Sequence, residues 1–271
     1  MTTLDDKTIQ DFDEQWTRYS DNDGWYASLD LFKDMISPLL SCEDLKDKNI
    51  ADIGSGTGRI VGMLLDAGAS HVYAIEPATG AYQKMKANIA EMPKGDQVTC
   101  INARGDDWQA ASPLDYVFSI GVIQFIVDPG TTLKTAYDNL KPGGDIFLWL
   151  YSYEGNELYL NFIQPLRKLT TKLPHFMLTV VIEVLYATLC IYRLATTLLP
   201  LPLKKYIETI WWPMTPKKRR LVIYDQLNPS HAKYHKKHEA LEILEKSGFC
   251  NLEIHHRHGY SWCVKGTKPC A

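Results

Sequence analysis

The stretch Asn49-Ile50-Ala51-Asp52-Ile53-Gly54-Ser55-Gly56-Thr57-Gly58 decides the fold of this chain. It begins with an apolar run of the kind that forms a buried strand, and three glycines at alternate positions follow. Glycine permits a sharp turn and lets a ligand lie against bare backbone N–H groups where a helix begins, here at about Arg59. The stretch therefore predicts a strand, a glycine-rich turn and a helix that bind a nucleotide-like cofactor.

Strands and helices alternate on both sides of this stretch. Further apolar strands are predicted at residues 71–76, 98–102, 114–120 and 145–151, with helices at residues 79–92 and 131–140 between them. Such alternation is typical of a parallel sheet that is covered by helices on both faces. After residue 236 the pattern predicts one more helix, at residues 237–246, and then a β-hairpin at residues 249–254 and 259–266.

The spacing of the glycines narrows the choice of cofactor. Dinucleotide-binding turns place their third glycine one residue later than Gly58, and a P-loop would continue with Gly-Lys-Ser/Thr, which is absent from the sequence here. Asp52, just before the turn, would repel a pyrophosphate. Glu76, at the end of the second strand, can accept hydrogen bonds from two ribose hydroxyls. Acids at these two places favour a ribosyl ligand with a cationic group, such as S-adenosylmethionine.

Residues 49–151 resemble a class I S-adenosylmethionine-dependent methyltransferase. Five motifs in the family's order carry the resemblance: Asp52-Ile53-Gly54-Ser55-Gly56-Thr57-Gly58, Ala74-Ile75-Glu76-Pro77, Gly105-Asp106-Asp107-Trp108, Asp115-Tyr116-Val117-Phe118-Ser119-Ile120-Gly121-Val122 and Leu140-Lys141-Pro142-Gly143-Gly144. The chain is similar to small-molecule enzymes of the family with a helical insertion after strand five. The resemblance implies an α/β, Rossmann-like methyltransferase fold, with a mostly parallel seven-stranded sheet, a C-terminal antiparallel hairpin and a helical cap.

The resemblance also implies the cofactor, S-adenosyl-L-methionine, and the residues that bind it. The expected contacts are Asp52, Gly54, Ser55, Gly56, Thr57, Gly58, Glu76, Pro77, Asp106, Asp107, Trp108, Ser119 and Gly121. The acid that contacts the adenine stays open between Asp106 and Asp107. The chain departs from relatives that carry paired histidines after the fourth strand, because Gln124 and Phe125 stand there.

Four segments follow from these patterns. Residues 1–48 form an N-terminal helical segment that is a candidate lid, and residues 49–151 form the S-adenosylmethionine-binding core. Residues 152–235 form a mainly helical, apolar insertion that caps the core. Residues 236–271 supply the return helix and the hairpin that complete the sheet.

The apolar stretch at residues 173–203 has three interpretations. It is long enough to cross a bilayer, which takes about 20 apolar residues, but Glu183 and Arg193 lie inside it, and charges are costly in a membrane. A buried or substrate-capping helix is therefore favoured over a transmembrane span. Transient, shallow membrane contact is the remaining alternative.

The acceptor side of the site is inferred from position alone, and the general base is not identified. Weak candidates for the base are His235 and Tyr234, and the expected substrate contacts are Trp16, Tyr19, Tyr151, Asp225 and Asn228. No metal site is expected, because the histidine and cysteine spacings are loose. Six cysteines without a C-x-x-C pair, and no signal-peptide pattern at the start, indicate reduced thiols in a cytoplasmic protein.

These observations predict an enzyme that transfers a methyl group to O or N of a small molecule by in-line displacement. The apolar insertion suggests an apolar or lipid-like acceptor. The alternatives are a methyltransferase that acts on RNA or protein, supported by the basic residues 217–220, and a non-catalytic binding protein of the same fold. With a net charge of −3, no nucleic-acid partner is expected. The sequence does not determine the oligomeric state.

Overall fold

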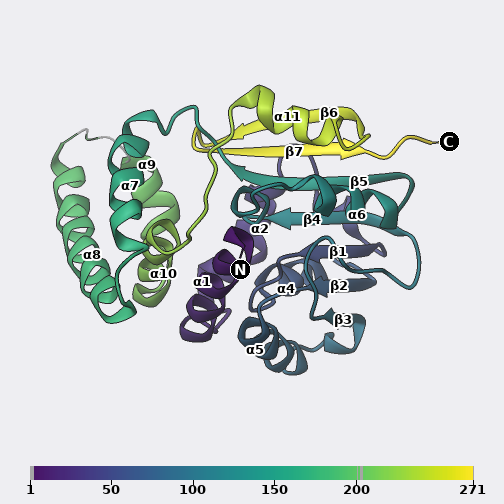
Figure 1. Cartoon of the computed structure of the whole chain (residues 1–271), viewed down its shortest axis with the longest axis horizontal. Coiled ribbons are helices and arrows are strands. Elements are labelled where there is room, and N and C mark those ends of the chain that lie inside the picture. Colours follow the sequence, from purple (N-terminus) through teal and green to yellow (C-terminus); the bar gives the residue numbers. More distant parts are fainter. Residues whose placement is uncertain (1–2, 200, 202–203, 271) are drawn as a thin grey trace.

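The computed structural model describes residues 3–199, 201 and 204–270, in which one mixed sheet is flanked by helices and a helical cap stands at one end (Figure 1). The strands are β1 (Asn49–Ile53), β2 (His71–Ile75), β3 (Val98–Ile101), β4 (Leu114–Ile120), β5 (Leu140–Tyr151), β6 (Cys250–Arg257) and β7 (Ser261–Thr267). Their order in the sheet is β3-β2-β1-β4-β5-β7-β6. Strands β1 to β5 pair in parallel, and β7 pairs antiparallel with both β5 and β6. The predicted fold class is confirmed.

Two hydrophobic cores lie on the two faces of the sheet. Helices α2 (Leu29–Ile36), α4 (Arg59–Asp66) and α5 (Thr79–Ala90) bury Phe32, Leu64 and Met85 on one face. Helices α6 (Gly130–Asn139) and α11 (Lys237–Glu245) bury Leu133 and Leu244 on the other. Shorter elements are α3 (Cys42–Leu45), η1 (Gly24–Ala27), η2 (Gly95–Gln97) and η3 (Ile123–Phe125). The covered faces explain why β1, β2 and β4 are buried along most of their length.

Strand β5 begins earlier than its sequence pattern predicts. It starts at Leu140, which pairs with Leu114, and the next pair joins Asp145 to Tyr116. The residues between Leu140 and Asp145 therefore form a bulge in the strand, and Gly143 adopts the positive φ of 75° that this bulge requires. The sequence Lys141-Pro142-Gly143-Gly144 follows the end of helix α6 as expected, but these residues already belong to strand β5.

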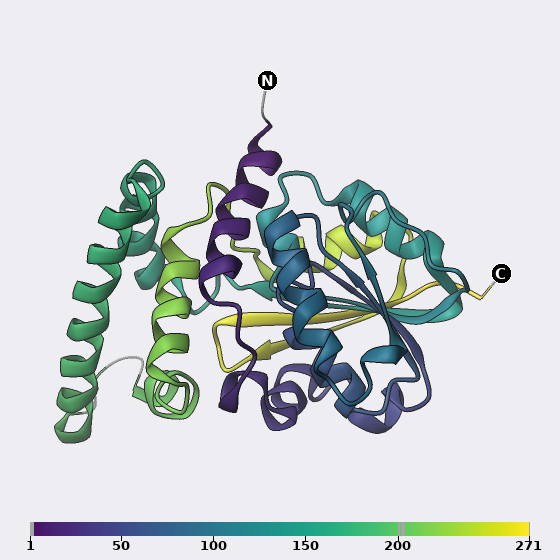
Figure 2. The same ribbon diagram turned by 90° about the horizontal axis from the view of Figure 1, so that it is seen from below.

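The cap consists of α7 (Glu157–Thr170), α8 (His175–Leu198), α9 (Lys204–Tyr206), the π-helix η4 (Ile207–Trp211) and α10 (Pro216–Leu227). These helices enclose a third core, which includes Ile163, Ile182 and Trp211. Figure 2 shows that α1 (Leu4–Arg18) lies between the cap and the helices of the core.

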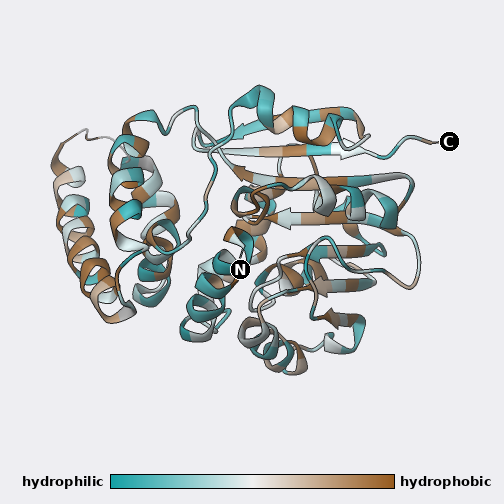
Figure 3. Ribbon diagram, viewed as in Figure 1, coloured by the Kyte–Doolittle hydropathy of each residue, from teal (hydrophilic) through white to brown (hydrophobic). Residues whose placement is uncertain are grey.

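The sequence favoured a buried or substrate-capping helix at residues 173–203, and helix α8 is not buried. Residues Phe176–Leu198 are long and apolar enough to cross a membrane, yet only 11% of their most apolar window is buried inside the protein. Figures 1 and 3 show α8 at the edge of the cap farthest from the sheet, with apolar residues along it. Sequence reasoning was wrong on this point, because hydrophobicity alone does not reveal whether a neighbouring element covers the helix.

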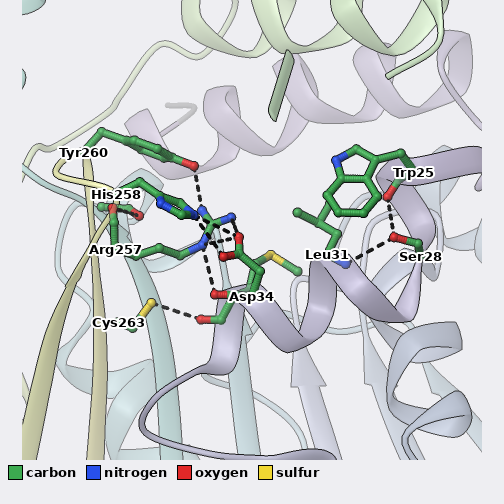
Figure 4. Close-up of polar contacts among 10 residues, drawn as sticks. Trp25, Ser28, Leu31, Asp34, Arg257, His258, Tyr260 and Cys263 are labelled. Atoms are coloured by element: carbon green, nitrogen blue, oxygen red, sulfur yellow. Dashed lines mark hydrogen bonds and ion pairs between the residues drawn. The ribbon is translucent and has the colours of Figure 1, made fainter. Parts of the chain in front are cut away.

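The N-terminal segment is joined to the C-terminal hairpin by a polar cluster around Asp34 on α2 (Figure 4). Its carboxylate pairs with the guanidinium of Arg257, whose side chain is only 4% exposed, and contacts Nε2 of His258 at 2.9 Å. The Tyr260 hydroxyl accepts a hydrogen bond of 2.7 Å from Arg257. The Cys263 thiol donates to the carbonyl of Met35 at 3.1 Å. These contacts fix α2 against β6 and β7.

Removing the carboxylate of Asp34 is expected to destabilise the protein. Asp34→Ala leaves the Arg257 charge buried without its carboxylate, which costs about 3–5 kcal/mol of unfolding free energy. Asp30→Ala on the same helix is the control. Asp30 pairs with Lys33 on the surface at 3.9 Å, so its loss should cost less than about 0.5 kcal/mol. Urea unfolding measures both, and equal losses would contradict the role of the cluster.

Candidate active site

A cavity lies at the carboxyl edge of β1, β2 and β4, where parallel α/β sheets bind ligands. Three parts of the chain line it: the N-terminal helix α1, the loops that follow the strands, and α10 of the cap. Its wall includes Thr8, Ile9, Phe12, Trp16, Gly54, Ser55, Gly56, Thr57, Arg59, Glu76, Pro77, Arg104, Asp106, Gly121, Val122, Phe125 and Asp225. The cavity thus joins the predicted cofactor side to the predicted acceptor side.

The glycine turn leaves no space for side chains. Gly54, Gly56 and Gly58 have φ values of 77°, 55° and 84°, which L-residues rarely adopt. A Cβ on Gly54 would lie 2.4 Å from a methyl group of Val122, and one on Gly56 would lie 3.3 Å from the Trp16 ring. Close packing against these side chains therefore requires glycine at both positions.

Two carboxyl groups, those of Asp52 and Glu76, are buried beside this turn. Glu76 accepts hydrogen bonds from the N–H groups of Gly56, at 2.8 Å, and Ala78, at 2.9 Å. Asp52 Oδ2 is buried and has no hydrogen-bond partner among the described residues. Burial raises the pKa of each group to about 7.

The residues present fit S-adenosylmethionine. Glu76 lines the cavity, and each of its carboxyl oxygens accepts only one hydrogen bond, so it can also accept from the hydroxyls of a ribose. Asp52, buried behind the wall, has an oxygen without a partner among the described residues, and when ionised it favours a ligand with positive charge. Gly54 and Gly56 form part of the wall with backbone alone.

The structure separates the predicted cofactor residues into two groups. Those on the cavity wall are Gly54, Ser55, Gly56, Thr57, Glu76, Pro77, Asp106 and Gly121. Asp52, Gly58, Trp108 and Ser119 lie behind it, and Asp107 is exposed outside it. The Trp108 indole donates to the Gly105 carbonyl at 3.0 Å, so this residue shapes the loop from the core. Of the two acids left open by the sequence, Asp106 is the one at the cavity.

Helix α1 supplies a wall that sequence analysis recognised only at Trp16. Ile9, Phe12 and Trp16 face the cavity at i, i+3 and i+7, a spacing that was readable in the sequence. Asp13 accepts a 2.9 Å hydrogen bond from the N–H of Ala81 at the start of α5. The helix therefore covers the cofactor side, in the position expected of a lid.

The connection after α1 is attached to the glycine turn by Asn22. Its amide donates to the Thr57 carbonyl at 2.7 Å, and its side-chain oxygen accepts from the Thr57 hydroxyl at 2.8 Å. Asn88 of α5 donates to the carbonyls of both Ser20 and Thr57. No sequence motif marks Asn22, because its partner lies 35 residues away.

Asp225 of α10 is the titratable residue of the cap that reaches the cavity wall. Its carboxylate accepts hydrogen bonds from Gln15, at 3.0 Å, and from the hydroxyl of Tyr151, at 2.6 Å. Gln226 donates to the same hydroxyl at 2.8 Å and accepts from Tyr234. Loss of hydration raises the pKa of Asp225. These hydrogen bonds hold the Asp225 carboxyl group on the wall of the cavity that also contains the cofactor side.

The other predicted acceptor-side residues, apart from Trp16, lie off the wall. Tyr151 and Tyr234 stack on each other and support Asp225 through hydrogen bonds. Tyr19 packs against Tyr224 in the cap core, and Asn228 donates to the carbonyl of Asp11.

His235 is buried, and the desolvation lowers its pKa to about 4. It lies in a non-helical segment before α11 and forms an isolated bridge with Ser152. The described residues contain no group of three side chains suited to a metal ion.

Comparisons with known proteins agree with this geometry. Residues 50–144 match the family described as "Methyltransferase domain". Among curated relatives, tRNA U34 carboxymethyltransferase of Alteromonas mediterranea is 28% identical over 46% of this chain and 38% of its own length. The enzyme of the same name from Desulfotalea psychrophila is 33% identical over 44% of this chain and 37% of its own length. The chain thus spans well under half the length of these relatives.

Solved structures show the same fold at low sequence identity. An O-methyltransferase family protein from Burkholderia thailandensis superposes with a TM-score of 0.56 and 10% identity, over 97% of this chain and 60% of that one. An S-adenosylmethionine-dependent methyltransferase from Thermotoga maritima, a possible histamine N-methyltransferase by its title, gives 0.51 and 14%, over 96% and 99%. The protein has the class I methyltransferase fold. The family match places a methyltransferase domain at residues 50–144.

The raised pKa values predict how stability depends on pH. The unfolded chain releases the Asp52 and Glu76 protons near 3.8 and 4.5, whereas the folded protein holds them to about 7. Between these pH values the folded state binds more protons than the unfolded state. The contribution of the two groups to the unfolding free energy therefore falls as pH rises, and it becomes constant above about pH 7. Asp52→Asn should therefore stabilise the protein at pH 8, by about 1–3 kcal/mol, and by less at pH 5.

Thermal unfolding without ligand measures this effect. Asp107→Asn, at an exposed site off the wall, is the control and should change little at either pH. An Asp52→Asn effect that is equal at pH 5 and pH 8 would show that the buried carboxyl does not titrate in this range.

Proposed function

We propose that this protein is an S-adenosylmethionine-dependent methyltransferase that methylates O or N of a small, largely apolar molecule. The observation that carries the proposal is the single cavity wall that joins the glycine turn and Glu76 to Asp225 of the cap. A cofactor side and an acceptor side that share one cavity are what group transfer requires, because the protein must align donor and acceptor. A binding protein without catalysis has no need for the second side.

The cofactor side is assigned from contacts in the structure. S-adenosylmethionine supplies a methyl group already activated on a sulfonium. Glu76 would accept hydrogen bonds from the ribose, with its orientation fixed by the Gly56 and Ala78 N–H groups. Asp106 lines the neighbouring wall, and the buried Asp52 carries a negative charge above about pH 7, which favours a cationic ligand.

Asp225 is the proposed acceptor-side group. Hydrogen bonds from Gln15 and Tyr151 hold its carboxylate on the wall, and its raised pKa makes it a better proton acceptor than an ordinary aspartate. It would orient the hydroxyl or amine of the acceptor and take up its proton. Phe12, Phe125 and Ile126 line the wall near it, so the acceptor should be largely apolar.

The basic residues 217–220 do not form a free cationic surface. Lys217 and Lys218 both pair with Asp21, and the Lys218 side chain is 1% exposed. Arg219 lies 3.8 Å from the centre of the Trp212 ring, and Arg220 pairs with Glu183. The basic residues that offered support for an RNA substrate are thus engaged with other residues of the protein. This supports a small acceptor, since RNA binding relies on accessible cations.

A tRNA acceptor is the second candidate. It is favoured by the curated relatives, which are tRNA U34 carboxymethyltransferases. Those matches cover less than half of this chain and less than two fifths of the relatives' own length, so they leave most of each chain uncompared.

Substitutions of single acidic residues should show whether cofactor binding depends on particular carboxyl groups or only on negative charge in this region. Glu76→Ala should weaken binding of S-adenosylhomocysteine by about 100-fold or more, because hydrogen bonds to a charged group contribute about 1.5–3 kcal/mol each. Asp106→Ala should weaken it about tenfold. Asp107→Ala, one residue away but exposed, is the matched control and should bind like the wild type. Calorimetry measures all three, and wild-type affinity in Glu76→Ala would remove the site.

Asp225→Asn tests the acceptor side. It keeps the shape and most hydrogen bonds, so affinity for S-adenosylhomocysteine should stay within about twofold, while kcat should fall about 100-fold or more if the carboxylate takes the proton. The assay needs an acceptor, which can be sought by incubating small-molecule extract and total tRNA separately with methyl-labelled S-adenosylmethionine. Label in tRNA alone would favour the second candidate. An unchanged kcat in Asp225→Asn would exclude its proposed role.

A further inference from the structure

Helix α8 presents an apolar surface that no described part of the chain covers. Its outward residues Phe176, Val180, Val184, Ile191, Leu194 and Leu198 are 61–81% exposed and recur at helical spacing; they are called the α8 stripe below. The 23 residues of the apolar segment extend for roughly 35 Å at 1.5 Å per residue. A stripe of this size on an isolated soluble protein marks an interaction site.

The charges of α8 are turned toward the protein. Glu183 receives two hydrogen bonds from Arg220 of α10, at 2.7 and 2.9 Å. The Arg193 guanidinium lies 4.6 Å from the centre of the Trp212 ring. Both charges that argued against a transmembrane span in the sequence therefore interact with residues of α10 and of the end of η4. The stripe itself carries no charged residue.

The exposed hydroxyls of α8 are also satisfied within the helix. Thr188 donates to the Val184 carbonyl at 2.9 Å, and Thr197 donates to the Leu194 carbonyl at 2.7 Å. Such bonds leave no hydroxyl proton that needs water, which is what a helix surface in contact with hydrocarbon requires.

The neighbouring helix α7 and the turn that follows it expose apolar and basic residues together. Leu158, Phe162 and Leu169 are 64–79% exposed, and Lys168 and Lys172 are exposed with them. Lysine is depleted in protein–protein interfaces, but beside an apolar helix face it is favoured by anionic lipid headgroups. This charge pattern identifies a membrane surface, in preference to a second copy of the chain, as the occupant.

We propose that the protein docks on anionic membranes through the α8 stripe, with Lys168 and Lys172 at the headgroups and α8 lying in the plane of the interface. A transmembrane arrangement does not fit, since the inner side of α8 is packed: Leu178 and Ile182 are buried and Glu183 is paired with Arg220. The docking goes beyond the proposed methyl transfer and is measured without turnover.

Flotation with vesicles tests the docking. The purified full-length chain is mixed with vesicles of phosphatidylcholine, with or without about 30% phosphatidylglycerol, and should float mainly with the anionic ones. Leu194→Asp places a charge on the stripe and should reduce vesicle binding at least about tenfold. Leu4→Asp, on α1 and also exposed, is the matched control and should bind like the wild type. Lys168→Ala with Lys172→Ala should cost about fivefold per lysine on anionic vesicles only.

Three results would overturn the proposal. If the wild-type chain floats with neither vesicle type, the α8 stripe is not a membrane-docking surface. A dimer by light scattering that Leu194→Asp converts to a monomer, without flotation, would assign the stripe to a second copy. Vesicle binding that resists alkaline carbonate would indicate a span. Circular dichroism of Leu194→Asp confirms that the variant is folded.

Discussion

The burial of two carboxyl groups beside one glycine turn constrains the rest of this structure. Asp52 and Glu76 lie at the ends of adjacent strands, and each raises the cost of ionising the other. Placing them there costs stability unless a ligand with hydroxyls and positive charge occupies the site. The glycines remove the side chains that would block such a ligand, and α1 covers it. The cofactor side is therefore a region where the fold gives up stability for binding.

The cap connects this site to the outside of the molecule. Helix α10 carries Asp225 on the cavity wall and packs on its other side against α8, so one helix separates the acceptor side from the α8 stripe. This arrangement would place the acceptor side close to a membrane surface, which is consistent with the proposed apolar acceptor. The basic start of α10 serves the same architecture, because Lys218 and Arg220 join the cap to the N-terminal segment and to α8.

The comparisons divide the chain in the same way as the structure does. The matched domain at residues 50–144 holds the glycine turn, Glu76 and Asp106. Asp225, Trp16 and the whole of α8 lie outside it, and these are the residues on which the proposed acceptor and the proposed docking depend. The matched domain thus holds the cofactor side, and the proposed acceptor specificity depends on segments outside it.

The sequence by itself determined the core, because strand, glycine turn and helix signals are local and the five motifs lie within about 100 residues. It determined Glu76 for the same reason, as the acid that ends a strand. Only the tertiary structure decided between Asp106 and Asp107, brought α1 and Asn22 over the glycine turn, and placed Asp225, in preference to His235, on the cavity wall. It also showed that α8 is exposed. Each of these depends on contacts between residues far apart in the chain, and composition and periodicity carry no information about which distant surfaces meet.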